Sequence, residues 1–571
     1  MTKNKKRNTY MYILLAVGII ILVAGSAIMA KKYAPTKERM DLSEVYGITF
    51  ENEAAVIIDG TYTAHQEGDD YANAVILSGM PYMQIDFLKA NIDNGYVYDR
   101  DEGILRYTTD KDIISANRGD SSYFIGRSEE NVGVSIIEEE GGEIYLALPF
   151  IKEFSDITYT VESEPDRIVI EKAGWEKTVA TVKRNTQIRR LGGPKSKILA
   201  DVKKGDGITV IENVGKWSCV MTGDGVIGYM PDKYIVDREN DTTPATLPER
   251  DYRHISMSDK VSLGWFQTME QSGNAGLDGV LSDAGDSINV ISPTWFRLSD
   301  NKGGISNIAS YDSVKKCHDK GIQVWALLNN FDNKDVDSSV VLGSTSARDN
   351  LINNLIGAAV AYDLDGINVD FEYLQESDAD GFLEFVRELS IKCENNDIVL
   401  SIDNYVPSSF HAFYDYAEQA KYADYIVIMA YDEHYAGGDE AGSVSSIGFV
   451  SDAAKNMLEY VPKEQIVMGL PFYYRLWVTN STGLSSSAIH MDETEELLEK
   501  YDVTTTWLDD VGQSYAEFDR DDSFYQMWIE DPKSLGLKLS VVKENDLAGA
   551  AFWKLGLETA AAWDVINEYL Q

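Results

Sequence analysis

Eight apolar runs between residues 251 and 571 constrain the fold of this chain more than any other feature. They begin near residues 260, 288, 322, 365, 398, 422, 466 and 547, and helical stretches lie between most of them. Parallel strands that are buried on both faces are nearly continuous in apolar residues, as these runs are. Eight such strands alternating with helices predict an α/β fold in which residues 251–571 form a (β/α)8 TIM barrel. A doubly wound open sheet is the alternative, but the segment GWFQTMEQSG lacks the glycine-rich phosphate turn that often follows the first strand of that fold.

The fourth run, DGINVDFE, carries acidic residues in an alternating pattern. Alternate residues of a strand share a face, so Gly366, Asn368, Asp370 and Glu372 point into the predicted barrel while the apolar residues between them face the helices. Two carboxylates ~6.5–7 Å apart along a strand are costly to bury unless they are used or paired. Crowding raises the pKa of such groups, which suits an acid that donates a proton near neutral pH.

A solvated acidic strand end is the alternative interpretation of this segment. The strict alternation, the seven companion strands and the helix predicted from about Asp378 argue against it. Active sites of such barrels lie at the carboxyl ends of the strands, where these carboxylates fall.

Four segments of this region resemble glycoside hydrolase family 18, the chitinase-like family. DGINVDFE resembles the family's DGxDxDxE signature, MAYDEHY at 429 its Met-x-Tyr-Asp strand, MGLPFYYRLW at 468 its Gly-x-Pro-x-Tyr-x-Arg strand, and GAAFWKLGLE at 549 its last strand. The resemblance covers essentially all of 251–571, and within the family the chain is most similar to the spore-cortex and cell-wall glucosaminidase branch.

This resemblance implies cleavage of β-1,4 links next to N-acetylglucosamine with help from the substrate's own acetamido group, so the protein needs no nucleophile. It implies that Glu372 is the general acid and then the base, that Asp370 holds the acetamido N–H, and that Tyr431 donates to the acetamido carbonyl. The substrate-binding residues implied are Asn368, Asp432, Tyr473, Arg475, Trp265 and Trp553, the last as the floor under the distorted sugar. No metal or organic cofactor is implied.

Asn368 departs from the family pattern, which has an aspartate there that can share a proton with its neighbour. An amide can donate a hydrogen bond to Asp370 but cannot hold a transferable proton. We expect altered pH dependence or a lower rate, and not loss of activity, because Asp370 and Glu372 both remain.

Several other aromatic and polar residues fall near predicted strand ends. Trp265, Trp295 and Trp325 follow the first three strands, where stacking on a sugar competes with plain packing, and packing is equally expected for Trp325 between Val324 and Ala326. Glu433 and His434 are interpreted as polar wall residues. Residues 476–546 form a long break in which TTTWLDDVGQSYAEF predicts a hairpin and DPKSLGLKLSVVKEN a helix.

The N-terminus predicts a membrane anchor over residues 1–40. The 20 residues from Met11 to Ala30 are apolar or small throughout, which matches the ~20 residues needed to cross a bilayer. Basic residues before the run predict a cytoplasmic start, with the remainder outside. A cleaved signal peptide is the alternative, but its apolar region is usually ~7–15 residues long, and no clear cleavage site ends this run.

Two β-rich modules are predicted between the anchor and the barrel. Residues 41–172 contain short strands, including a hairpin in GYVYDRDEGILRYTT, and resemble the copper amine oxidase N-terminal-like (stalk) domain without any copper chemistry. Residues 176–237 resemble a bacterial SH3 domain, an SH3-like β-barrel that either binds cell-wall peptides or acts as a spacer. Residues 238–250 are polar with two prolines and are interpreted as a linker.

Composition narrows the class of partner. The 93 acidic residues outnumber 51 basic ones and give a net charge of −42, which disfavours binding to nucleic acid. Three widely spaced cysteines provide no disulfide framework. The sequence therefore predicts a membrane-anchored, cell-wall-facing glycoside hydrolase that acts on peptidoglycan or a chitin-like glycan. A non-catalytic glycan-binding protein and a wall-assembly scaffold on the same fold are the alternatives. The presence of Glu372 argues against the first, and the presence of Asp370, Tyr431 and Trp553 argues against the second.

Overall fold

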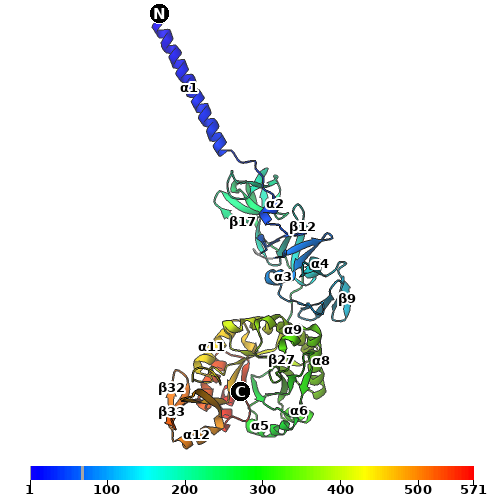
Figure 1. Cartoon of the computed structure of the whole chain (residues 1–571), viewed down its shortest axis with the longest axis vertical. Coiled ribbons are helices and arrows are strands. Elements are labelled where there is room, and N and C mark those ends of the chain that lie inside the picture. The colour runs from blue at the N-terminus through cyan, green and yellow to red at the C-terminus, as the bar shows by residue number, and fades with distance from the viewer. Residues whose placement is uncertain (1, 66–69, 571) are drawn as a thin grey trace. The chain divides into compact units, whose positions relative to one another are not determined.

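The computed structural model describes residues 2–65 and 70–570, and Figure 1 shows the chain coloured by residue number. The chain divides into two compact units. The first comprises residues 1–96, 116–123 and 129–249, and the second comprises residues 97–115, 124–128 and 250–571. The barrel lies in the second unit.

A closed barrel of eight parallel strands forms the centre of the second unit. Its strands are β21 (Val261–Phe266), β22 (Val290–Pro293), β25 (Gln323–Asn329), β26 (Gly366–Asp370), β27 (Val399–Tyr405), β28 (Tyr425–Met429), β29 (Ile466–Pro471) and β35 (Gly549–Trp553). Each pairs in parallel with its neighbours in that order, and β35 pairs with β21 to close the ring. All eight predicted runs are barrel strands, so the predicted TIM barrel is confirmed.

Helices cover the outside of this barrel. They are α5 (Leu277–Ala284), α6 (Tyr311–His318), α7 (Ser338–Gly343), α8 (Thr345–Tyr362), α9 (Ala379–Glu394), α10 (Tyr416–Tyr422), α11 (Ile447–Met457), α13 (Pro532–Glu544) and α14 (Ala560–Leu570). On β26 the apolar face packs against them as predicted: the ring of Phe371 stacks on Phe385 of α9 with centroids 5.5 Å apart. A separate core lies inside the barrel and includes Trp265 of β21 and Trp325 of β25. Polar residues of β26 are therefore held inside the barrel by burial of their apolar neighbours.

Two short additions decorate the barrel. After β22, strands β23 (Phe296–Leu298) and β24 (Ile305–Asn307) form an antiparallel pair. After β29, a five-stranded antiparallel sheet fills the long break, with strand order β31-β30-β34-β33-β32. Its elements are β30 (Tyr473–Asn480), β31 (Gly483–His490), α12 (Thr494–Tyr501), β32 (Thr506–Leu508), β33 (Gln513–Arg520) and β34 (Ser523–Ile529). The predicted hairpin corresponds to β32–β33 and the predicted final helix to α13, so both are confirmed.

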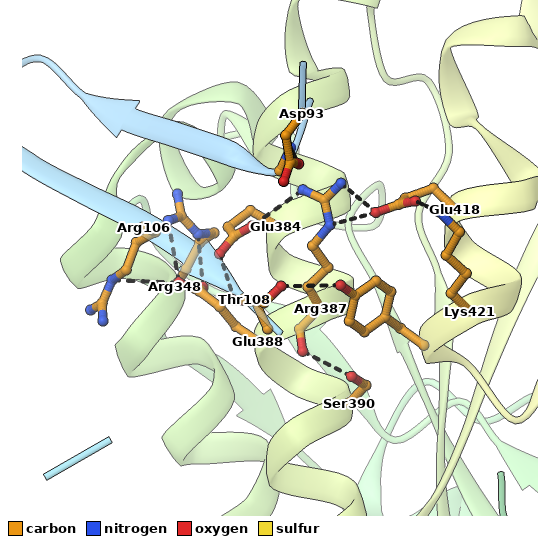
Figure 2. A network of polar contacts seen from close by, with 12 residues as sticks. Asp93, Arg106, Thr108, Arg348, Glu384, Arg387, Glu388, Ser390, Glu418 and Lys421 are labelled. Carbon is orange, nitrogen blue, oxygen red and sulfur yellow. Dashed lines mark hydrogen bonds and ion pairs between the residues drawn. The ribbon is translucent and has the colours of Figure 1, made fainter. Parts of the chain in front are cut away.

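Residues 97–115 belong to the barrel unit although they precede the barrel by more than a hundred positions. They include most of β5 (Tyr96–Asp99) and β7 (Ile113–Asn117) and all of β6 (Ile104–Thr108). Figure 2 shows the polar network that joins β6 to helices α8 and α9. Arg106 pairs with Asp349 at 2.6 Å, and Thr108 Oγ1 donates to Glu384 Oε1 at 2.8 Å. Because Glu384 is fully buried, this strand supplies a polar partner to the interior of the helical layer.

Three sheets lie in the first unit or start there. Strands β1 (Ala55–Ile58), β2 (Thr61–Thr63), β12 (Ile157–Glu162) and β13 (Arg167–Lys172) form one, and β3 (Ala74–Leu77), β4 (Met80–Gln84), β10 (Ile137–Glu140) and β11 (Glu143–Ala147) form another. The third runs β5-β6-β7-β8-β9, with β8 (Ser122–Ile125) and β9 (Ser128–Asn131). Short helices α2 (Leu42–Tyr46), α3 (Ile85–Asn91) and α4 (Leu148–Phe154) accompany them.

A seven-stranded antiparallel sheet follows, with the order β16-β15-β19-β18-β17-β14-β20. Its strands are β14 (Glu176–Val182), β15 (Thr186–Arg189), β16 (Ile198–Val202), β17 (Gly207–Val214), β18 (Trp217–Thr222), β19 (Ile227–Pro231) and β20 (Ile235–Thr242). These strands cover the predicted SH3-like region and extend five residues beyond it, into the predicted linker.

The N-terminal segment forms one helix, α1 (Thr2–Tyr33). Residue 1 lies outside the described residues, as do the side chains of residues 2–9, 27, 30 and 33, on which the anchor prediction partly depends. Within the described part of the chain, no helix has the length and apolar character needed to span a membrane. The predicted transmembrane helix is therefore not supported.

Candidate active site

The carboxyl ends of the barrel strands bring the predicted acidic pair together. Asp370 is the last residue of β26 and only 6% exposed, while Glu372 follows it and is half-buried. Both side chains point into the barrel, as the alternation predicts, because the alternate residues Ile367, Val369 and Phe371 are buried in the outer core. The pair therefore stands at the end of the barrel where active sites of this fold occur.

Glu372 is held on two sides by residues of neighbouring strands. Tyr405 Oη donates a hydrogen bond to Glu372 Oε2 at 2.7 Å. The side chain of Asn330 donates to the Glu372 carbonyl at 2.8 Å and accepts from its backbone N–H at 2.9 Å. Burial raises the pKa of Glu372, with a smaller contribution from the charge of Asp432, while the Tyr405 hydrogen bond opposes the rise. A fixed carboxyl with a raised pKa is suited to donate a proton at neutral pH.

Asp370 lies in a more strongly acidic environment. Burial raises its pKa well above the usual range, and the charges of Asp403, Glu372 and Asp332 add to the effect in that order. Within the described chain, Asp370 Oδ1 is buried and accepts no hydrogen bond. A buried carboxylate oxygen without a donor costs free energy, which a ligand N–H aimed at it would recover.

Asn368 makes four hydrogen bonds, and none of them reaches Asp370. Its Oδ1 accepts from Trp265 Nε1 at 3.1 Å and from Ser292 Oγ at 3.0 Å. Its Nδ2 donates to Ser401 Oγ at 3.0 Å and to Asp403 Oδ1 at 2.7 Å. The amide is thus saturated by protein partners and fully buried, while its assignment as a substrate-binding residue stays a prediction.

Three aromatic residues, Trp265, Tyr431 and Trp553, pack together at the carboxyl ends of their strands. The ring centroid of Trp265 lies 5.9 Å from that of Trp553 and 6.4 Å from that of Tyr431, and both contacts are edge-to-face. Trp553 and Tyr431 are half-buried, whereas Trp265 is 1% exposed. Trp265 is therefore covered, and its indole N–H donates to Asn368. Its assignment as a substrate-binding residue stays a prediction. Burial raises the pKa of Tyr431 well above its usual value, which keeps this phenol a proton donor.

Further polar residues predicted for the cleft cluster beside this group. Tyr473 Oη donates to Asp432 Oδ1 at 2.7 Å, and burial followed by the Asp432 charge raises the pKa of Tyr473. Arg475 donates from Nη1 to Ser486 Oγ at 3.2 Å. Both lie on β30, directly after barrel strand β29.

The remaining candidates have structural partners. Glu433 accepts from the Ser446 N–H at 2.8 Å, and His434 Nδ1 lies 2.9 Å from the Ser443 carbonyl, as expected of wall residues. Trp295 and Trp325 are both buried, and Trp325 stacks on Tyr425 inside the barrel.

Three site residues were absent from the prediction: Asn330, Asp403 and Tyr405. Asp403 and Tyr405 end β27 on the same inward-facing set as Ser401, so the alternation applied to β26 would have found them in IVLSIDNYV. The position of Asn330 one residue after β25 carries no comparable signal. Among the described residues, no cluster of three or more acidic, histidine or cysteine side chains is arranged to hold a metal ion.

A closed parallel barrel that presents a buried aspartate and a protonatable glutamate at its carboxyl end is a site for acid–base chemistry of the glycosidase type. The model of the glycosyl hydrolases family 18 matches residues 259–558, and the chain belongs to this family. It is accordingly a glycosidase.

Curated relatives are similar mainly over the barrel. The chain is 25% identical over 293 residues to the uncharacterized glycosylase YvbX of Bacillus subtilis, covering 49% of this chain and 84% of that protein. It is 25% identical over 255 residues to the cortical fragment-lytic enzyme of the same organism, covering 42% of this chain and 59% of that enzyme. For the latter, the chain therefore spans little more than half the relative's length.

Solved structures share the fold. The C-terminal domain of a putative chitinase from Desulfitobacterium hafniense aligns with a TM-score of 0.51 and 21% identity, covering 55% of this chain and all of that one. The spore cortex-lytic enzyme SleL of Bacillus cereus aligns with a TM-score of 0.51 and 18% identity, covering 64% of this chain and 89% of that one.

Proposed function

We propose that this protein hydrolyses β-1,4 links at N-acetylglucosamine in peptidoglycan, with retention of configuration and with the substrate's acetamido group as nucleophile. The observation that supports this most directly is the pairing of a protonatable Glu372 with a buried Asp370 oxygen that has no donor in the described chain. One group supplies a proton, and the other accepts a hydrogen bond from an amide N–H.

The reaction follows from these two groups. Glu372 gives its proton to the leaving glycosidic oxygen while the acetamido oxygen attacks the anomeric carbon. Asp370 accepts a hydrogen bond from the acetamido N–H and stabilises the positive charge of the oxazolinium that forms. Glu372, now ionised, removes a proton from the water that opens this ring, which returns the enzyme to its starting state.

Relatives named as cortical fragment-lytic enzymes support peptidoglycan over chitin as the substrate. The test incubates the purified full chain with peptidoglycan and, separately, with chitin oligomers, and identifies products by mass. Glu372→Gln is the control, because glutamine is nearly isosteric but donates no titratable proton. Cleavage of neither glycan with binding retained would favour the non-catalytic glycan-binding alternative.

The location outside the cytoplasm remains a proposal based on the apolar run Met11–Ala30 and the basic residues before it. We propose that this segment attaches the enzyme to the membrane with the barrel facing the wall. Protease added to intact cells should then digest the barrel, while the chain should sediment with membranes. A chain recovered only from the cytosol would refute the proposal, and one recovered only from the medium would indicate a cleaved signal.

Two module assignments also remain proposals: the stalk domain at 41–172 and the SH3-like domain at 176–237. Within the latter region, aromatic and charged residues line a cavity of about 870 Å³ that includes Trp217, Arg184 and Tyr234. A cell-wall peptide fits the chemistry of this cavity, with an apolar face beside charged groups. Trp217→Ala should weaken binding of purified wall peptides by about tenfold or more, whereas Ile211→Ala, outside the cavity, should not.

A further inference from the structure

Strand β27 places a second buried aspartate level with Asp370. The parallel pairing of β26 and β27 runs from Gly366 opposite Val399 to Val369 opposite Ile402. The next residues in this register are Asp370 and Asp403. Asp403 is 3% exposed and shares its inward face with Ser401 and Tyr405. Two acidic side chains from adjacent strands are therefore buried at the same height inside the barrel.

Asn368 fixes the orientation of Asp403. Asn368 Nδ2 donates to Asp403 Oδ1 at 2.7 Å, and the indole N–H of Trp265 in turn donates to Asn368 Oδ1 at 3.1 Å. Because an indole N–H can only donate, its bond to Asn368 Oδ1 leaves the Asn368 NH2 facing Asp403. The Asn368 amide therefore holds the Asp403 carboxylate in place by donating a hydrogen bond to it.

The titratable groups that face Asp403 are all acids, so each is either neutral or negatively charged and none is positive. They are Asp370 and Glu372 from β26 and Tyr431, which follows β28, and the charge of Asp403 raises the pKa of Tyr431. Among the described residues, no lysine or arginine pairs with Asp370 or Asp403, although buried cations pair with carboxylates elsewhere, as Arg348 does with Glu388. Nothing nearby compensates two buried negative charges.

Such a pair retains one proton near neutral pH. Burial raises the pKa of Asp403 to about 8, and the same cause, with Asp403 as the next contributor, raises that of Asp370. Interacting carboxylates titrate as a unit, so the second proton of the pair leaves only at high pH. The pair thus enters the reaction with a proton that one member must hold.

We propose that Asp403 is the positioning residue that takes this proton from Asp370 when substrate binds. Asp403, on β27, would thus perform the role that the family pattern gives to an aspartate at position 368 on β26. This inference rests on the proposed function. The proton moves from the Asp370 carboxyl to the Asp403 carboxylate, so Asp370 becomes the anion that receives the acetamido N–H. The proton returns to Asp370 when product leaves. The proton that Glu372 gives to the leaving oxygen is a different one and takes no part in this transfer.

The test compares pH–rate profiles of the full chain with those of Asp403→Asn. An amide cannot take the proton, so kcat should fall by about tenfold or more, while KM changes little. Removing the charge of Asp403 also lowers the pKa of Asp370 and Glu372, so the alkaline limb should move to lower pH by about half a unit or more.

The double variant Asn368→Asp with Asp403→Asn moves the carboxylate back to β26 and should recover most of the lost kcat and the original limb. Asp424→Asn is the matched control, because Asp424 is also buried with a raised pKa, and its hydrogen-bond donors among the described residues are the backbone N–H groups of Ile255 and Leu400. It should leave the pH profile unchanged. A profile unmoved by Asp403→Asn, or a swap that recovers nothing while the protein stays folded, would overturn the proposal.

A readout without substrate separates this inference from the proposed function. The infrared band of a protonated carboxyl should disappear across pH 8 in the wild type and at a lower pH in Asp403→Asn, where burial still raises the pKa of Asp370. Loss of the band in wild type without any glycan cleavage would refute the function and the proton transfer in catalysis together. A band that is lost at the same pH in both proteins would show that Asp403 is not coupled to this proton, and would refute the inference even if the enzyme cleaves.

Discussion

Replacing Tyr405 by phenylalanine isolates one hydrogen bond to the general acid. Tyr405 Oη donates to Glu372 Oε2 at 2.7 Å, and this bond holds the pKa of Glu372 down against the effect of burial. Phenylalanine keeps the ring and its stacking on His411, whose centroid lies 4.5 Å away, and removes only the hydroxyl, which also accepts a long hydrogen bond of 3.4 Å from the Tyr373 N–H. The variant therefore changes proton affinity with little change in packing.

The magnitude follows from the charge on the acceptor. A hydrogen bond to a charged group contributes roughly 1.5–3 kcal/mol, and one pKa unit corresponds to about 1.4 kcal/mol. Loss of the bond from the ionised form should raise the pKa of Glu372 by about one to two units. Because the acid must be protonated to act, the alkaline limb of the kcat/KM profile should move to higher pH by that amount. This direction is opposite to the one expected for Asp403→Asn.

The assay measures kcat/KM on a soluble glycan across the pH range for wild type and Tyr405→Phe. Tyr311→Phe is the matched control, because Tyr311 is 55% exposed on helix α6 and lies outside the site. An alkaline limb that stays in place or moves to lower pH would refute the reasoning that this hydroxyl tunes the acid.

Three further predictions concern stability, each read as a change in the unfolding free energy of the barrel unit. Lys538→Met should destabilise it by about 3–5 kcal/mol, because Lys538 and Glu530 form a fully buried ion pair, and the double variant with Glu530→Gln should recover part of the loss. Thr108→Val should cost about 1–3 kcal/mol by removing a donor to buried Glu384, while Thr109→Val, which bonds only within its own turn, should cost less. Gly366→Ala should cost about 1–3 kcal/mol, because the added carbon would lie 2.6 Å from the Trp325 ring and 3.0 Å from the Val399 carbonyl oxygen. A Thr108→Val barrel as stable as wild type would contradict the contribution assigned to residues 97–115.

The barrel could be predicted from the sequence because each of its strands is buried on both faces and therefore appears as a continuous apolar run. The same alternation that placed Asp370 and Glu372 inside the barrel applies to β27 and would have placed Asp403 and Tyr405 there. These two residues were missed because no family motif covers their strand.

Other features could not be predicted from local patterns. Trp265 lies near the end of a strand as a cleft residue would, but it is covered by Tyr431 and Trp553, which lie 166 and 288 positions further along the chain. The pairing of Arg106 with Asp349 joins residues 243 positions apart and leaves no periodic signal in either segment. The sequence predicts the β5–β6 hairpin that contains Arg106, but its place in the barrel unit depends on such distant pairs and could not be predicted.

The configuration of the newly formed reducing end tests the central claim most directly. Proton NMR of the first products from purified peptidoglycan should show the β-anomer before mutarotation, since attack by the acetamido group and then by water inverts the anomeric carbon twice. Glu372→Gln should reduce its formation by a factor of about 10²–10⁴. An α-anomer as the first product, or undiminished cleavage by Glu372→Gln, would contradict the account.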